Sequence, residues 1–187
     1  LAEIGTDLSA VKPGSESAAA LKRYLLERGL WSQYLEVGIG PDAEIFTKAP
    51  VLSSVGVGSD VGVLSDSTWN NPEPEEVLLV TSTGRIWGPT PGNDVNLRDI
   101  EGRSALLLGR AKDNNASCAL GPFIRVFDAT FGIDDVRALE VGLRVEGEDG
   151  YTLAASSHMA KISRDPEDLV EQLMGDKGKP PERAEYL

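Results

Sequence analysis

Cysteine and histidine are nearly absent from this chain of 187 residues, which contains a single Cys118 and a single His158. A lone cysteine excludes a disulfide within the chain and is typical of a reducing compartment, so we expect a cytoplasmic protein. One histidine also disfavours a zinc centre, which takes several nitrogen and sulfur ligands. His158 lies outside every motif described below, and we interpret it as a surface or structural residue.

Basic residues and long apolar runs are scarce as well. The 18 Lys and Arg residues face 30 Asp and Glu residues, and the net charge of −12 argues against nucleic acid as a partner, because phosphates need cationic side chains. Apolar runs stay below the roughly 18 residues of a membrane span, and we recognise no signal peptide, so we expect no membrane partner. The 41% hydrophobic content still suffices for the core of a globular domain.

Two helices are predicted from their caps and their apolar spacing. The first spans 16–28, where Ser15 suits the N-cap and Gly29 suits the position after the last turn. The second begins after Asp165 and ends at Gly175. Its buried stripe is predicted to consist of Leu169, Leu173 and Met174.

The middle of the chain has the residue pattern of β structure. A strand at 76–80 is followed by a turn at 81–84 and a returning segment at 85–88. We expect the prolines within 89–92 to break the ladder there. Further strands are predicted at 120–128, 139–146 and 151–155, with a hairpin turn at 147–150 between the last two.

Three carboxylates in this region have the spacing of a metal site. Glu73 and Glu75 are two residues apart on a proline-rich, extended segment, so their side chains face one side with about 7 Å between Cα atoms. Asp94 follows the returning segment, where a hairpin would carry it beside the other two. Because hard cations prefer oxygen ligands, the pattern predicts a site for Mg²⁺, or for Mn²⁺ or Ca²⁺, with positions left open for a substrate.

A longer series of motifs accompanies these acids. In chain order, it consists of Glu73-Pro74-Glu75, Thr90-Pro91-Gly92-Asn93-Asp94-Val95, Arg98-Asp99-Ile100-Glu101-Gly102, Ala111-Lys112 and Ser117-Cys118-Ala119-Leu120-Gly121-Pro122. From about residue 51 to residue 175, this series closely resembles the fumarylacetoacetate hydrolase family.

The resemblance implies a role for each of seven residues. The metal ligands would be Glu73, Glu75 and Asp94, the catalytic residue would be Lys112, and the substrate-binding residues would be Arg98, Glu101 and Ser117. Arg98 and Asp99 also match a pair that braces the site in the family, although a purely structural role fits them equally well. Asn96-Leu97 departs from the family pattern, which more often has small residues there, and we expect a reshaped pocket floor.

The stretch from Asp99 to Lys112 resembles the branch of the family that acts on 2-keto-3-deoxy sugar acids. The implied reaction is a dehydration through a metal-bound enolate, in which the cation polarises the keto group and Lys112 stabilises the enolate oxygen. Two alternatives stay open. One is a hydrolase that cleaves the carbon–carbon bond of acylpyruvates or 2,4-diketo acids, and the other is an inactive truncated fragment of either enzyme.

The resemblance also implies a fold and an assembly. The fold class is α+β, mainly β: a mixed β-sandwich roll of the fumarylacetoacetate hydrolase type with peripheral helices, incomplete because the family's C-terminal strands have no counterpart after Gly175. We therefore expect weak activity or none from this chain. The expected division is an N-terminal segment with one helix at 1–48, a partial catalytic domain at 49–175 and a polar, disordered tail at 176–187. A homodimer is implied for the full-length protein.

Overall fold

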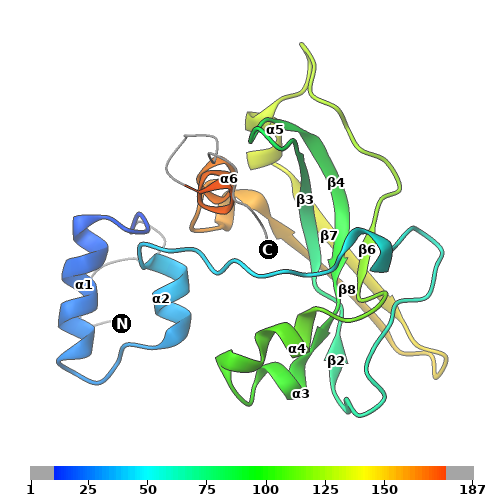
Figure 1. Ribbon diagram of the computed structural model, residues 1–187, viewed down its shortest axis with the longest axis horizontal. Helices are drawn as coiled ribbons and strands as arrows, with labels where there is room; N and C mark the ends of the chain where they lie inside the picture. Colours follow the sequence, from blue (N-terminus) through cyan, green and yellow to red (C-terminus); the bar gives the residue numbers. More distant parts are fainter. Residues whose placement is uncertain (1–10, 176–187) are drawn as a thin grey trace. The chain divides into compact units, whose positions relative to one another are not determined.

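The computed structural model describes residues 11–175, which form two units (Figure 1). Within the described range, one unit comprises 11–45 and 160–175, and the other comprises 46–159. The expected boundary after residue 48 differs from the observed one by a few residues. The segment 160–175, which we expected in the catalytic domain, groups with the N-terminal unit instead. The tail at 176–187 lies outside the described residues.

The smaller unit is helical, and its first helix follows from its cap. In α1 (Glu16–Leu26), the Ser15 hydroxyl accepts a hydrogen bond from the Ala18 N–H. Gly29 has a φ of +65°, which favours glycine after the last turn. The predicted helix is confirmed, although it ends at Leu26 rather than at residue 28. A second helix, α2 (Gln33–Ile39), corrects the expectation of one helix in this segment.

The C-terminal helix α6 (Pro166–Met174) begins after the predicted cap, because the Asp165 carboxylate accepts a hydrogen bond from the Glu167 N–H. The predicted stripe is wrong for Leu173, which is 54% exposed, whereas Leu169 and Met174 are half-buried. The fully buried residues of the helix are Pro166 and Val170. The core of this unit consists of Val11, Ala18, Leu21, Leu25 and Ile39, and the half-buried Tyr24, Trp31 and Leu35 pack against it.

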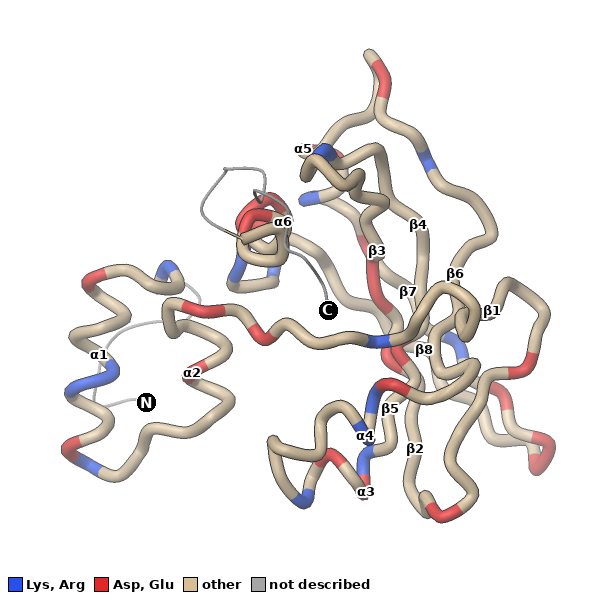
Figure 2. The backbone as a smooth tube through the Cα atoms, viewed as in Figure 1, with Lys and Arg blue, Asp and Glu red and all other residues tan. Residues whose placement is uncertain are grey.

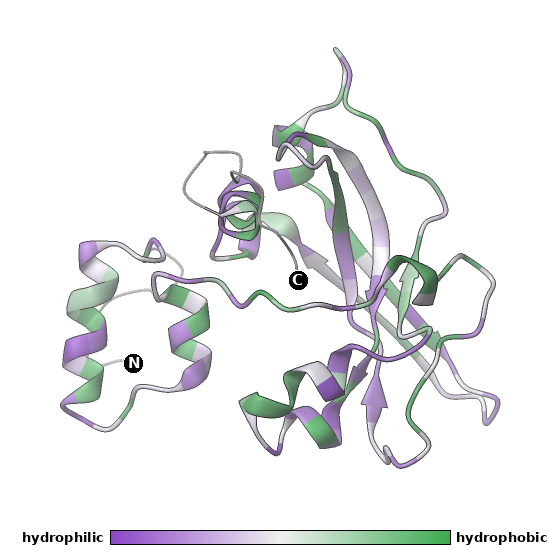
Figure 3. Cartoon of the chain, viewed as in Figure 1, coloured by the Kyte–Doolittle hydropathy of each residue, from purple (hydrophilic) through white to green (hydrophobic). Residues whose placement is uncertain are grey.

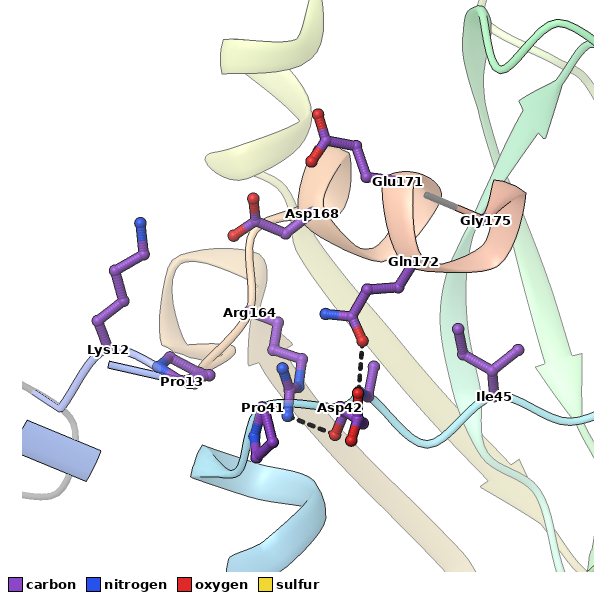
Figure 4. Close-up of a pocket in the computed structure, with 12 residues that line it drawn as sticks. Lys12, Pro13, Pro41, Asp42, Ile45, Arg164, Asp168, Glu171, Gln172 and Gly175 are labelled. Carbon is purple, nitrogen blue, oxygen red and sulfur yellow. Dashed lines mark hydrogen bonds between the residues drawn. The ribbon is translucent and has the colours of Figure 1, made fainter. Parts of the chain in front are cut away.

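Arg164 links the two sequence segments of the smaller unit beside the cavity drawn in Figure 4. Its guanidinium donates hydrogen bonds to three carbonyls at 2.7–3.2 Å, which belong to Val37, Gly40 and Asp42 at the end of α2. The Gln172 side chain accepts a further bond from the Ala43 N–H at 2.6 Å. Arg164 thus satisfies carbonyls that the helix end leaves unpaired.

The larger unit combines β-strands with short helices in a mixed α+β arrangement. Its main sheet has the order β1-β6-β4-β3, and two further pairs are β2 with β5 and β7 with β8. The strand bounds are β1 (Ser54–Val55), β2 (Asn70–Asn71), β3 (Pro74–Val80), β4 (Ile86–Asp94), β5 (Asn96–Leu97), β6 (Cys118–Leu120), β7 (Glu140–Glu146) and β8 (Thr152–His158). The helices are η2 (Val51–Ser53), α3 (Arg98–Glu101), η3 (Ala105–Leu107), α4 (Leu108–Lys112) and α5 (Ile133–Arg137), and η4 (Met159–Lys161) spans the boundary between the units.

The β3–β4 hairpin is confirmed, but β4 continues through the prolines that we expected to interrupt it. The Pro89 carbonyl accepts a hydrogen bond from the Arg125 N–H, and the Pro91 carbonyl accepts one from the Gly121 N–H. In a strand, the N–H and C=O of one residue point to the same side. The missing proline donors therefore face the segment 121–127 and leave the pairing with β3 intact.

The same prolines explain why the strand predicted at 120–128 is wrong. β6 ends at Leu120, and the following residues run beside β4 with bonds in one direction, such as the Arg125 N–H to the Pro89 carbonyl at 2.9 Å. In an antiparallel pair, two opposite residues exchange two N–H···O=C hydrogen bonds. A proline has no N–H and cannot donate one of them. The β7–β8 hairpin, in contrast, is confirmed close to its predicted bounds.

The core of the larger unit lies beneath β5 and the two short helices α3 and α4. It consists of Leu97, Ile100 and Ala111, with Leu64 and Leu107 packed against it. Figure 3 shows hydrophobic residues on the η3–α4 segment alternating with polar ones. Because β5 alternates between faces, Leu97 enters this core while the preceding Asn96 points the other way. Among the helices of residues 11–175, none has the length and apolarity that a membrane crossing requires.

Candidate metal centre

The β3–β4 hairpin brings the three predicted metal ligands together. Its register pairs Pro74 with Asn93, and the Asp94 N–H donates a hydrogen bond to the Glu73 carbonyl at 2.9 Å. The Asn93 side chain in turn accepts a bond from the Glu73 N–H at 3.1 Å. As a result, one carboxylate oxygen from each of Glu73, Glu75 and Asp94 lies within 4.8 Å of the other two.

Two lysines contact this acidic cluster from different elements. Figure 2 shows basic and acidic positions close together along the backbone of the larger unit. Lys112 ends α4 and is 4% exposed, and burial of the preceding Ala111 holds the helix in place. The Lys112 ammonium forms ion pairs with Glu73 Oε2 and, at 2.8 Å, with Asp94 Oδ2. Lys48 lies before β1, and its ammonium is 2.9 Å from the other oxygen of the same carboxylate, Asp94 Oδ1.

The charges in the cluster shift two pKa values. Burial by itself would lower the pKa of Lys112, but hydrogen bonds to Asp94 and Glu73 outweigh it, and the net effect raises the pKa. Loss of hydration, followed by repulsion from Asp94 and Glu73, raises the pKa of Glu75. The Lys112 ammonium acts in the opposite direction on Glu75 but does not cancel this increase. The cluster thus holds a charged lysine and an excess of negative charge.

A second set of polar residues continues from the carboxylates into β5 and α3. The Asn96 amide group donates to Glu73 Oε1 at 3.1 Å and to Glu101 Oε2 at 2.7 Å, and Asn96 has no exposed surface. Glu101 also pairs with Arg98 at 2.7 Å. Burial would raise the pKa of Glu101, but the bonds from Asn96 and Arg98 lower it on balance. Arg98 and Glu101 are therefore connected to the metal ligands through Asn96.

Ser117 and Asp99 hold the backbone around the cluster. Ser117 is 1% exposed, and its hydroxyl donates to the carbonyls of Lys112 or Asn114 at 2.8–2.9 Å and accepts from Lys48 at 3.1 Å. Asp99 accepts hydrogen bonds from the Ser67 hydroxyl and the Thr68 N–H. The site-facing role predicted for Ser117 and the bracing role predicted for Asp99 remain predictions about function, but both residues organise the loops beside the site.

Lys48 was not among the predicted residues, although its ammonium contacts Asp94, the Ser117 hydroxyl and the carbonyls of Val95 and Lys112. It lies in an irregular segment without a periodic pattern, so nothing marked it before the fold was known. Asn96 was noted as a departure from the family pattern, and the structure places it between two carboxylates. His158 lies on the exposed strand β8, where its ring is 4.0 Å from Glu140.

The donor set fits a hard divalent cation. Each of the three clustered side chains offers carboxylate oxygen, and Mg²⁺, Mn²⁺ and Ca²⁺ prefer oxygen ligands. The side chains of Glu73 and Asp94 are held by backbone and side-chain bonds, which fixes two of the three donors before any ion binds. The arrangement can therefore serve as a partly preformed site for such an ion.

Comparison with known proteins finds relatives that are named as dehydratases. The chain is 35% identical over 133 residues to a 2-dehydro-3-deoxy-D-arabinonate dehydratase of Saccharolobus solfataricus, covering 71% of this chain and 44% of that protein. It is 31% identical over 144 residues to a probable 2-keto-3-deoxyxylonate dehydratase of Haloferax volcanii, covering 77% and 48%. No protein-family model matches the sequence.

Solved structures agree with these relatives. A 2-keto-3-deoxy-D-arabinonate dehydratase in its apo form superposes with a TM-score of 0.72 at 32% identity, over 80% of this chain and 52% of that one. A dehydratase of the same name, complexed with magnesium and 2,5-dioxopentanoate, superposes with a TM-score of 0.67 at 32% identity and the same coverage. The chain spans about half the length of the proteins that it matches. It belongs to the fumarylacetoacetate hydrolase family, in which it resembles the 2-keto-3-deoxy-arabinonate dehydratases.

Proposed function

We propose that this chain carries the metal site of a divalent-metal-dependent lyase that dehydrates 2-keto-3-deoxy sugar acids. The observation that supports the proposal most directly is the convergence of Glu73, Glu75 and Asp94, with the buried Lys112 between two of them. Both curated relatives are named as dehydratases of this substrate class. Because the chain spans about half of their length, the activity and the substrate are proposals for the whole protein.

Glu73, Glu75 and Asp94 are the residues that would hold the cation, and Mg²⁺ is the ion present in one of the matching dehydratase structures. When bound, a divalent ion supplies Lewis-acid polarisation of a carbonyl oxygen. The three carboxylates come from one hairpin whose register is fixed by backbone pairing. The held side chains of Glu73 and Asp94 favour binding, because they need little further ordering when an ion arrives.

Lys112 would hold a proton next to the reacting oxygen. Its raised pKa keeps the ammonium charged at neutral pH, and its contacts with Glu73 and Asp94 place Nζ at the cluster. A buried ammonium beside the cluster stabilises negative charge that develops on a substrate oxygen during proton removal. The expected substrate is a 2-keto acid, in keeping with the 2,5-dioxopentanoate bound to the matching dehydratase.

Arg98, Glu101 and Ser117 remain the proposed substrate-binding residues, with different expected contributions. Arg98 keeps 41% of its side chain exposed, so its guanidinium can reach a substrate carboxylate while pairing with Glu101. The Ser117 hydroxyl already contacts Lys48 and two backbone carbonyls inside the protein. We therefore propose direct binding by Arg98 and a positioning contribution from Ser117.

The proposal is tested by product analysis with the whole protein. With Mg²⁺, a panel of 2-keto-3-deoxy pentonates and hexonates should yield the dehydrated semialdehyde, and Asp94→Ala should abolish it. Glu140→Ala, at an exposed acid on β7, is the matched control and should leave turnover unchanged. Formation of pyruvate and a second acid from acylpyruvates, without dehydration of the sugar acids, would show that the protein is a hydrolase and not a lyase.

A further inference from the structure

In each of the two best-fixed carboxylates of the cluster, one oxygen faces a protein group other than Lys112. Glu73 Oε1 accepts from the Asn96 amide at 3.1 Å and from the Asn71 amide at 3.4 Å. Asp94 Oδ1 is buried and lies 2.9 Å from the Lys48 ammonium. This contact is an ion pair without a hydrogen bond.

The remaining oxygens of these two carboxylates converge on one point. Glu73 Oε2 and Asp94 Oδ2 both contact a single positive group, the Lys112 ammonium. Each carboxylate therefore turns one oxygen toward the centre of the cluster, where a bound cation would take the place of the Lys112 ammonium, and turns the other toward the Asn96 amide or the Lys48 ammonium. Such a carboxylate is set to bind a cation through one oxygen rather than through both.

The orientation of Asn96 is dictated by its neighbours. Glu73 and Glu101 offer carboxylate oxygens, which accept hydrogen bonds when ionised, so the amide must turn its NH₂ group toward them. The amide oxygen of Asn96 is left buried without a hydrogen-bond partner in the described part of the chain. Neither a leucine nor a flipped amide can replace the donated bond, so Glu73 Oε1 depends on Asn96 for its strongest side-chain contact.

Lys48 holds one oxygen of Asp94, as Asn96 holds one oxygen of Glu73. Its ammonium also contacts the carbonyls of Val95 and Lys112 and the hydroxyl of Ser117. These contacts hold the charge against Asp94 Oδ1 from the side of β6 and α4. The charge cannot swing toward Oδ2 without breaking bonds to the backbone.

We propose that Asn96 and Lys48 are positioning residues that restrict Glu73 and Asp94 to one-oxygen coordination and thereby set the choice of metal. Mg²⁺ and Mn²⁺ need a compact octahedral shell, which single oxygens fill well, whereas Ca²⁺ takes more ligands and often binds both oxygens of a carboxylate. The site therefore favours Mg²⁺ and Mn²⁺ over Ca²⁺. The inference rests on the proposed function, because it assumes that the cluster binds a divalent ion.

The test measures the dissociation constants of Mg²⁺, Mn²⁺ and Ca²⁺ by calorimetry for the unmodified chain, Asn96→Leu and Lys48→Met. Each variant removes one restraint without adding charge, so the ratio of Ca²⁺ affinity to Mg²⁺ affinity should rise about tenfold or more. Asn70→Leu, at an exposed asparagine next to Asn71, and Lys161→Met, at an exposed lysine, are the controls and should leave the ratio unchanged.

The inference is overturned if both variants still bind metal and their ratio of Ca²⁺ affinity to Mg²⁺ affinity changes less than about twofold. That result would leave the proposed function standing. Failure of the unmodified chain to bind any of the three ions overturns both. If the variants do not fold, infrared difference spectra of the unmodified chain decide the matter. The carboxylate stretches distinguish one-oxygen from two-oxygen coordination, and two-oxygen bands for the bound Mg²⁺ would contradict the proposal.

Discussion

At the scale of single residues, the site is organised by pairs in which a positive or amide donor holds a carboxylate. Glu73 and Asp94 share Lys112, and each also has a donor of its own in Asn96 and Lys48. Removing one partner of such a buried pair leaves the other charge unbalanced, which costs more than the pair itself contributes. Substitutions at these positions should therefore change the affinity for the metal and the rate of turnover in different directions.

Lys112→Met is expected to separate metal affinity from turnover. The variant removes a positive charge from the two carboxylates, so repulsion of an incoming cation falls and the affinity for Mg²⁺ should stay equal or increase. Turnover of the proposed substrate should drop by ~100-fold or more, as for the loss of a group that stabilises an oxyanion. Calorimetry and steady-state kinetics on the same preparation check both. Equal losses of affinity and turnover would show that Lys112 serves folding instead.

Asp99 gives a prediction for pH dependence. The Thr68 N–H and then the Ser67 hydroxyl lower the pKa of Asp99 in the folded chain. Because the folded pKa lies below the unfolded one, the contribution to stability is present above the unfolded value of about 3.9 and is lost as the pH falls through the folded value. Asp99→Asn should lower the melting temperature at pH 7 by a few degrees and have a smaller effect near pH 3. Melting curves of both proteins at the two pH values measure the effect. An equal difference in melting temperature at pH 7 and pH 3 would argue that the charge of Asp99 plays no part.

Some residues of the site could be predicted from the sequence, and others could not. The family resemblance identified Glu73, Asp94 and Lys112, and the hairpin prediction explained how the two acids meet. Lys48 carried no comparable signal, because its importance comes from contacts with residues 47 to 69 positions away in the chain. Such long-range contacts depend on the complete fold of the larger unit, and neither spacing nor periodicity encodes them.

At the scale of elements, prediction succeeded where local chemistry decides and failed where packing decides. The caps at Ser15 and Asp165 and the turn between β7 and β8 depend on nearby residues, and all three were predicted. The length of β4 depends on which side of the strand Pro89 and Pro91 face, and this is set by its neighbours in the sheet. The inward face of α6 likewise depends on what the helix packs against.

The face of α6 can be tested by a pair of substitutions. Val170 is 8% exposed and Leu173 is 54% exposed, which reverses the expectation for Leu173. Val170→Ala removes two buried methyl groups and should destabilise the chain by about 1–2 kcal/mol. Leu173→Ala removes more atoms but should cost less than about 0.5 kcal/mol, because most of its surface is in water already. Urea titrations give both values, and the reverse order would restore the predicted stripe.

At the scale of the whole molecule, the candidate site belongs to one unit alone. All seven residues predicted for the site, together with Lys48 and Asn96, lie within 46–159. The roll-like completion of the sheets and the homodimer stay predictions. The chain covers about half the length of the dehydratases that it resembles, so its own ability to bind metal is a separate question from turnover by the whole protein.

Metal binding by this chain should therefore stabilise the larger unit selectively. A ligand that binds the folded state at 100 times its dissociation constant adds about 2.7 kcal/mol to the free energy of unfolding. For a chain of this size, that corresponds to a rise of roughly 5–10 °C in melting temperature. Hydrogen exchange resolves where the protection falls, and Mg²⁺ should slow exchange in 73–97 and 108–118 while leaving 16–39 unchanged. Asp94→Ala should remove both effects, because it takes away a ligand held between two lysines. Protection spread equally over both units would instead mean that the ion acts on the chain through sites outside the carboxylate cluster.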